Sequence, residues 1–352
     1  MTSSDAFAAE LLEASATGYA ALATERLLAA NPDIARRFSP DAPGAWRAAL
    51  GQRIVELATA LRLGEPKLFA ARVTWARRAF EAREVPDEDL RASLLALGTV
   101  LAEELPEATR TAPAALLNEA LAEFDRPVAA GDSFIDPQTK AGRIALAYIA
   151  AVLEGDSRKA AELVLARVAS GLDTEAAYLD VLVPAQREVG RLWHAGELGV
   201  IEEHIVTNTT ERLMALLAHD AERAPANGRT VVCAAVTGNV HDIAVRVLAD
   251  FFEIAGWRAV HLGGNVPTAE LGAALQYFDG ELLVLSAALS VQLPKVAEAI
   301  AAVRRIEDRR VRVMVGGLAF SDAPEIWRRL GADGYAADAR AAVKLAAELC
   351  AG

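Results

Sequence analysis

All five histidines of the chain lie between positions 194 and 261, and none occurs before them. Imidazole changes protonation near neutral pH and is the commonest metal-ligating side chain, so histidine chemistry is expected in the second half. Two histidines stand in informative surroundings. His241 follows an apolar run, within the segment Thr237–Ala244, and His194 adjoins Trp193. For His241 the simplest alternative is a histidine that only caps the helix after it.

From residue 226 onward, short apolar runs alternate with helical patterns, which predicts five β–α units. Such units form a doubly wound, flavodoxin-like parallel sheet over 226–352, and ligands bind at the carboxyl ends of its strands. We expect the segment Gly263–Pro267 to follow the second strand. The strands are predicted at 230–236, 257–262, 281–287, 311–317 and 334–337, and the groups at this edge are Asn239, His241, Gly263, Ser286, Gly316 and Gly317.

The spacing of these groups resembles the cobalamin-binding domain of the methionine-synthase type. That family has Asp-x-His-x-x-Gly, then 41 residues, Ser-x-Leu, then 26–28 residues, and Gly-Gly. Here 41 residues separate Ala244 from Ser286, and 27 separate Ala288 from Gly316. The resemblance implies that His241 is the lower cobalt ligand in place of the cofactor's dimethylbenzimidazole. The displaced nucleotide tail would then pass Ser286 and Gly316–Gly317.

Three positions depart from that family pattern. Asn239 replaces the aspartate, Ala244 the first glycine and Ala288 the leucine. An amide oxygen accepts a hydrogen bond from the ligand histidine but carries no charge, so a more labile His–Co bond is expected. The alternative is a degenerate domain that no longer binds cobalamin.

The preceding block, residues 139–222, has four predicted helices at about 140–153, 157–169, 173–194 and 200–219, which make a bundle. Trp193-His194 ends one helix, and Glu203-His204 lies in the first turns of the next. Across the turn at Gly196 both pairs can face one cavity. The alternative is core packing with a solvated histidine.

This arrangement resembles the cap of the CarH-like photoreceptors, in which Glu-His follows ten residues after the tryptophan of a Trp-His pair. The resemblance implies adenosylcobalamin as the cofactor, with Trp193 as a lid over its adenosyl group and Glu203 and His204 as adenosyl contacts. It also implies that visible light breaks the cobalt–carbon bond and that His194 then becomes the upper cobalt ligand.

Residues 1–126 have helical periodicity and no strand signal, which predicts an all-α, globin-like module of five or six helices, followed by a linker at 127–138. One helix is expected through Leu11–Leu22. The block has no histidine or cysteine, so a tetrapyrrole there would be noncovalent and without those ligands. A pocket could be lined by Trp46, Trp75, Phe69 and Phe80 with Arg72, Arg77 and Arg78 for propionates; in the alternative, the aromatics are core and the arginines a solvated face. Together with the cap, the architecture resembles the photocobilins, which implies biliverdin as a second chromophore.

Composition narrows the function further. Hydrophobic residues make up 53% and the net charge is −12, which fits a globular chain and disfavours direct DNA binding. No run is apolar enough to span a membrane, no secretory pattern opens the sequence, and two cysteines form no disulfide framework, so a cytoplasmic protein is expected.

The resemblances to CarH-like photoreceptors and photocobilins therefore imply a light sensor rather than an enzyme, with a change of conformation or assembly as its output. A homo-oligomer, dimer or tetramer, and a regulatory or effector protein are the expected partners. One alternative is a corrinoid carrier subunit of a methyltransferase or mutase. Another is an antirepressor that senses cobalamin itself.

Overall fold

The computed structural model describes residues 3–126, 132–307 and 310–351. The chain divides into two compact units, Met1–Ala130 and Gly131–Gly352, and each is described by itself. The predicted linker at 127–138 begins with residues 127–131, which lie outside the described residues.

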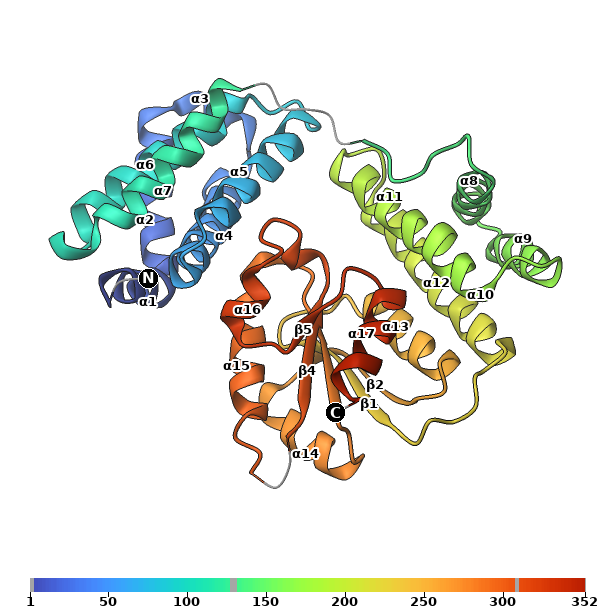
Figure 1. The fold of residues 1–352 in the computed structure, drawn as a ribbon. Helices are drawn as coiled ribbons and strands as arrows, with labels where there is room; N and C mark the ends of the chain where they lie inside the picture. The colour runs from blue at the N-terminus through green and yellow to red at the C-terminus, as the bar shows by residue number, and fades with distance from the viewer. Residues whose placement is uncertain (1–2, 127–131, 308–309, 352) are drawn as a thin grey trace. The chain divides into compact units, whose positions relative to one another are not determined.

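The N-terminal unit is all-α, as predicted (Figure 1). The predicted first helix is in fact two helices, which meet at Ser15, and Pro32 begins a further short helix. The described part of this unit therefore has seven α-helices in place of the expected five or six. The helices are α1 (Ser3–Ala14), α2 (Ala16–Ala30), α3 (Pro32–Arg37), α4 (Ala42–Leu63), α5 (Pro66–Glu81), α6 (Asp87–Glu104) and α7 (Thr111–Ala122).

Helix α4 shows why these segments are helical. The Asp41 carboxylate accepts a hydrogen bond from the Gly44 N–H and caps its start, and Gly64, with φ of 57°, ends it. Trp46 is buried and meets the rings of Phe38 and Phe80 edge to face, which joins α4 to the helices beside it.

The second unit begins with the helical block. Its helices are α8 (Lys140–Leu153), α9 (Ser157–Ala169), α10 (Thr174–Ala176), α11 (Val183–His194) and α12 (Val200–Asp220). The single helix expected at 173–194 is interrupted, because residues Ala177–Leu182 wind as a π-helix. Pro184, at the start of α11, has no N–H to donate to the preceding turn, which accounts for the irregularity.

The sheet is a five-stranded parallel sheet in the order β2-β1-β3-β4-β5, the flavodoxin-like order predicted. Its strands are β1 (Thr230–Val236), β2 (Arg258–Val266), β3 (Leu282–Ser286), β4 (Arg312–Gly316) and β5 (Gly334–Tyr335). Figure 1 shows helices on both faces, with α13 (Ile243–Ile254) and α17 (Ala339–Leu349) on one and α14 (Leu271–Tyr277), α15 (Leu293–Val303) and α16 (Ile326–Leu330) on the other.

One boundary differs from the prediction. Strand β2 continues to Val266, so Gly263 and Asn265 lie within it rather than after it. The strand bends as it continues: its register against β1 shifts twice, and Gly263 and Asn265 have φ of 83° and 51°. Pairing of Val236 with Val266 extends the ladder past the point where the apolar run ends.

Within the described ranges, no helix is both long and apolar enough to cross a membrane.

Candidate functional site

His241 lies in the loop between β1 and α13, at the carboxyl edge of the sheet, and is exposed. Its Nδ1 is 3.3 Å from Oδ1 of Asn239, and its backbone N–H donates to the same oxygen at 3.2 Å. With Nδ1 directed at an acceptor, Nδ1 carries the proton and Nε2 keeps its lone pair. Nε2 is therefore the nitrogen available to a metal.

Asn239 is fully buried and joins two strands' ends. Its Nδ2 donates to the backbone carbonyl of Ser286 at 3.1 Å, and Ser286 ends β3. The amide oxygen therefore has to face His241. The expected acceptor role of Asn239 is thus present in the geometry.

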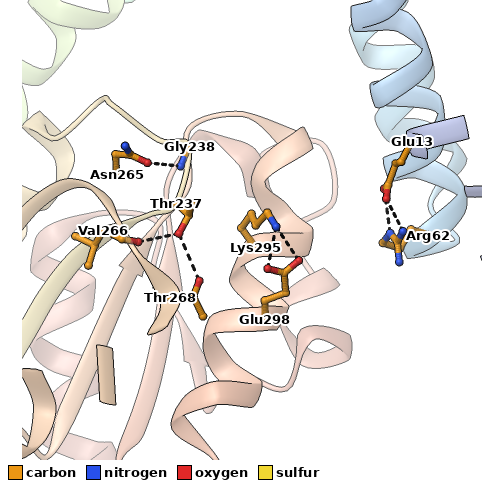
Figure 2. A network of polar contacts seen from close by, with 9 residues as sticks. All are labelled: Glu13, Arg62, Thr237, Gly238, Asn265, Val266, Thr268, Lys295 and Glu298. Carbon is orange, nitrogen blue, oxygen red and sulfur yellow. Dashed lines mark hydrogen bonds and ion pairs between the residues drawn. The ribbon is translucent and has the colours of Figure 1, made fainter. Parts of the chain in front are cut away.

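The loop that carries His241 is also fixed from the side of β2. Asn265 Oδ1 accepts from the Gly238 N–H at 2.7 Å, and the Thr237 hydroxyl donates to the Val266 carbonyl at 2.8 Å (Figure 2). The Asn265 N–H in turn donates to the Asn239 carbonyl at 2.7 Å. These bonds fix the segment Thr237–Asp242, here called the ligand loop, against β2.

The glycines at this edge serve two different purposes. A Cβ on Gly317 would lie 2.3 Å from the Ala287 carbonyl oxygen, and one on Gly316 would lie 2.8 Å from the Ala336 oxygen. Both positions must therefore be glycine to avoid a clash with the protein's own backbone, whether or not a ligand binds there. A Cβ on Gly263 would meet no atom within 4 Å, so open space lies beside that residue.

Exposed apolar side chains surround the site. Val240, beside His241, is 73% exposed, and Leu289 and Leu318 lie on the loops after β3 and β4. On the first turns of α12, Ile201 is 74% exposed, with Val200 and Ile205 also exposed. Apolar groups exposed at strand ends are typical of a binding surface for a large, partly apolar ligand.

The cap residues predicted as a group come from adjoining helix ends. Trp193 and His194 end α11, are partly buried, and lead into a turn at Gly196 with φ of 70°. The Glu203 carboxylate contacts His204 Nδ1 at 2.6 Å and accepts from the Thr207 hydroxyl at 2.8 Å. His204 itself is exposed.

Gln186 sets the register of α11 against α12. Its Nε2 donates to Thr210 Oγ1 at 2.6 Å, and its Oε1 accepts from Thr207 at 3.3 Å. Both helices rise about 1.5 Å per residue. Because they run in opposite directions, Trp193 comes level with the first turns of α12, where Glu203 lies.

Helix α12 also reaches the loop of His241. Glu211 lies against Asp242, the residue after His241, and burial followed by the Asp242 charge raises the pKa of Glu211. Glu203 is eight residues earlier on α12, or about 12 Å along its axis. Helix α12 thus extends along its axis from the ligand loop, at Glu211, to the turn that lies beside Trp193, at Glu203.

A second buried contact joins the helical block to α13. The hydroxyl of Tyr178, in the π-helix, lies 2.8 Å from both the Met214 carbonyl oxygen and Asp250 Oδ2. Burial raises the pKa of Asp250 to about 6, and it raises the pKa of Tyr178 as well, with the Asp250 charge adding to it.

The other two histidines are not among the predicted site residues. His219 is exposed near the end of α12. His261 lies in β2 opposite Cys233 of β1, and burial, then the charge of Arg246, lowers its pKa.

In the N-terminal unit, Trp46 and Phe69 are core residues, whereas Trp75 is exposed beside Arg72, whose guanidinium carbon is 5.6 Å from the ring centre. Arg77 is buried and binds the Asp87 carboxylate and the Glu123 carbonyl oxygen. Its predicted pairing with a propionate is therefore wrong, because its donors already have partners, and it is not on a solvated face either. Of the other predicted residues, Phe80 packs on Trp46 and Arg78 is half-buried.

The residues at the sheet edge fit a corrinoid. An imidazole with its Nε2 directed away from its neighbours is a suitable cobalt ligand, and the apolar rim suits a macrocycle. A corrin would supply its own ring nitrogens to the cobalt, so the protein would need to add only His241. Among the described residues no three His, Cys, Asp or Glu side chains gather as a separate metal site.

Comparisons with known proteins agree with this geometry. A family model described as a B12 binding domain matches residues 229–344, and a second with the same description matches 145–218. Dimethylamine corrinoid protein 3 of Methanosarcina mazei is 31% identical over 123 residues, which cover 34% of this chain and 72% of that protein. The chain belongs to the B12-binding protein family. It is thus a cobalamin-binding protein.

Its relatives differ in what their names describe. The HTH-type transcriptional repressor CarH of Myxococcus xanthus is 28% identical over 167 residues, 47% of this chain and 55% of that protein. The monomethylamine corrinoid protein of Methanosarcina barkeri has the same fold, with a TM-score of 0.53 at 22% identity over 59% of this chain and 98% of that one.

Several residues of the site have no sequence signal of their own. Asn265, Tyr178 and Glu211 act through contacts between segments far apart in the chain. Among them, only Asn265 has a sequence signal in its neighbours, because the two glycines before it indicate an unusual backbone conformation.

Proposed function

We propose that this B12-binding protein is a light sensor that uses adenosylcobalamin. The observation that carries the proposal is the pairing of Trp193-His194 with Glu203-His204 at adjoining ends of α11 and α12, in the register set by Gln186. An aromatic side chain and a carboxylate suit a bulky upper ligand that donates hydrogen bonds, such as an adenosyl group, better than they suit a methyl group.

In this proposal each residue has a definite task. His241 holds cobalt from the sheet side, oriented by Asn239. Trp193 covers the upper ligand, Glu203 accepts hydrogen bonds from it, and His194 waits at the end of α11. The cofactor supplies a cobalt–carbon bond that visible light cleaves.

The output follows from how α11 and α12 are attached. Both belong to the helical block that contacts α13 through Tyr178 and the ligand loop through Glu211. Movement of His194 toward the metal would pull on those contacts, which is a ligand switch on a bistable interface. A changed homo-oligomer, or altered binding of an effector protein, would carry the signal.

The test uses the full chain loaded with adenosylcobalamin in the dark. Absorption spectra are recorded before and after green light for the wild type, for His194→Ala, and for His219→Ala as the matched control. We expect a stable bis-imidazole spectrum in the wild type and in the control, and its loss in His194→Ala. Size-exclusion chromatography with light scattering, in the dark and after light, reports any change of assembly. Release of aquocobalamin from all three proteins would contradict the proposal.

The N-terminal unit belongs to the same proposal as the site of a second, noncovalent chromophore, biliverdin. Arg72 and Arg78 are the other two arginines of the predicted pocket. Addition of biliverdin to cobalamin-free protein should produce a structured far-red band that is weakened in Arg78→Ala. An unchanged free-biliverdin spectrum would count against it.

The second candidate is a corrinoid carrier, because corrinoid proteins are prominent among the relatives. A carrier would retain methylcobalamin at least as tightly as adenosylcobalamin, and its dark and illuminated forms would have the same size. A response to cobalamin alone, identical in dark and light, would instead select a vitamin-sensing antirepressor.

A further inference from the structure

Gln292 is a buried side chain just before α15, and all of its hydrogen bonds go to loop backbone at the site edge. Its Oε1 accepts from the N–H groups of Ala288 and Leu289 at 2.9 and 3.0 Å. Its Nε2 donates to the Gly238 carbonyl oxygen at 3.0 Å. Only 5% of the residue is exposed.

These partners stand on opposite sides of one boundary in the sheet. Ala288 and Leu289 follow β3, whereas Gly238 follows β1. The direction in which strands are added to the sheet reverses between β1 and β3, because β2 lies on one side of β1 and β3 lies on the other. Gln292 therefore crosses the place where ligands enter doubly wound sheets.

Gly238 is the residue before Asn239, so its peptide groups fix the direction of the chain into the ligand loop. Its N–H is held by Asn265 from the side of β2, and its carbonyl is held by Gln292 from the side of β3. Gly238 has a φ of 81°, and as a glycine it has no side chain to pack, so hydrogen bonds to its backbone fix its conformation.

We propose that Gln292 is a positioning residue for the cobalt ligand His241. By holding the Gly238 carbonyl it keeps Asn239 over Ser286, and Asn239 in turn directs Nε2 of His241 away from the protein. The ligand class is a corrinoid whose lower position is taken by a protein imidazole. The inference rests on the ligand role of His241 within the proposed function.

Two variants separate the parts of this role. Gln292→Glu keeps the acceptor for Ala288 and Leu289 but places a carboxylate oxygen against the Gly238 carbonyl, so only the link to the ligand loop is broken. Gln292→Leu removes all three bonds. Gln276→Glu, on the exposed side of α14, is the matched control.

The measurement is the electron paramagnetic resonance spectrum of cob(II)alamin bound to full-length protein labelled with ¹⁵N-histidine. Coordination by His241 gives doublet hyperfine splitting, whereas the cofactor's own ¹⁴N base gives triplets. We expect doublets in the wild type and in Gln276→Glu. In Gln292→Glu we expect the doublets to be lost and cobalamin affinity to fall 10- to 100-fold, as for other residues that orient metal ligands.

Circular dichroism and the melting temperature show whether each variant folds, and Gln292→Glu decides if Gln292→Leu does not. Wild-type doublets retained by a folded Gln292→Glu would overturn the positioning role while leaving His241 as the ligand. Triplets in the wild type itself would overturn the ligand role of His241, and the inference with it.

Discussion

The side-chain amide of Asn239 donates to the backbone carbonyl of Ser286, and this one bond orients the group that faces His241. An aspartate at this position has no proton to donate at neutral pH. Asn239 therefore does more than remove the negative charge of the family's aspartate, because it also links the end of β3 to the ligand loop. The Asn239 side chain thus both orients the His241 imidazole and joins the loop after β1 to the end of β3.

Asn239→Asp should destabilise the cofactor-free protein. A buried carboxylate would face the Ser286 carbonyl, and a lost bond of this kind costs about 1–3 kcal/mol in the free energy of unfolding. Urea denaturation measures the change. Asn265→Asp is the matched control, because Asn265 uses only its oxygen, and it should change stability by less than about 0.5 kcal/mol. Equal stability of the two variants would contradict the donor role of Asn239.

His241→Ala should lose the protein ligand without loss of the fold, since the side chain is exposed. We expect cobalamin affinity to fall by more than the 10- to 100-fold typical of residues that only orient a ligand. Free imidazole should partly restore the His-coordinated spectrum. Binding unchanged by the substitution would show that the lower position is not filled by His241.

Gly317→Ala should be among the most damaging single-methyl changes at the site. Its Cβ would lie 2.3 Å from the Ala287 oxygen, and φ is 102°, so about 2–5 kcal/mol is expected. Gly263→Ala has a similar φ of 83° but open space around its Cβ, and should cost about 1–2 kcal/mol. Thermal unfolding of both variants tests the order, and a reversed order would refute the packing argument.

Asp250 should make stability depend on pH. Its pKa in the folded protein, about 6, lies above the ordinary value, so its protonated form favours folding. That contribution is complete below about pH 4 and is lost as pH rises through about 6, up to about 3 kcal/mol.

Asp250→Asn keeps a partner for Tyr178 but cannot ionise. Its stability relative to the wild type should therefore increase between pH 4 and pH 7. Arg246, Glu253 and Arg223 also lie near this carboxyl, so Glu253→Gln serves as a control that keeps Asp250. A difference between wild type and Asp250→Asn that does not vary with pH would contradict the shift.

Periodicity and spacing were sufficient to predict most of the fold. Strand β1 and helix α5 have strong local patterns, and the expected sheet order is the one observed. The end of β2 was not predictable, because Gly263 and Asn265 have poor strand propensity and are held there by pairing with β1. The break between α1 and α2 likewise has no proline to announce it.

The candidate site was predictable where a residue's position in the chain fixes its place in space. His241 follows β1 and Ser286 ends β3, so their meeting at one edge follows from topology. The partners of these residues could not be deduced. Gln292 and Glu211 reach the loop across gaps in sequence that only packing specifies, and the buried Arg77 has an ion pair that periodicity does not reveal.

The π-helix at Ala177–Leu182 has a consequence for the orientation of α11. A π turn contains one residue more than an α turn, and each residue of an α-helix advances by about 100° around the axis. If the same residues wound as a regular α-helix, Trp193 and His194 would be rotated by about that angle. The azimuth of the aromatic–imidazole pair is therefore set upstream, by Pro184 and the turn before it, rather than at the helix end where the pair lies.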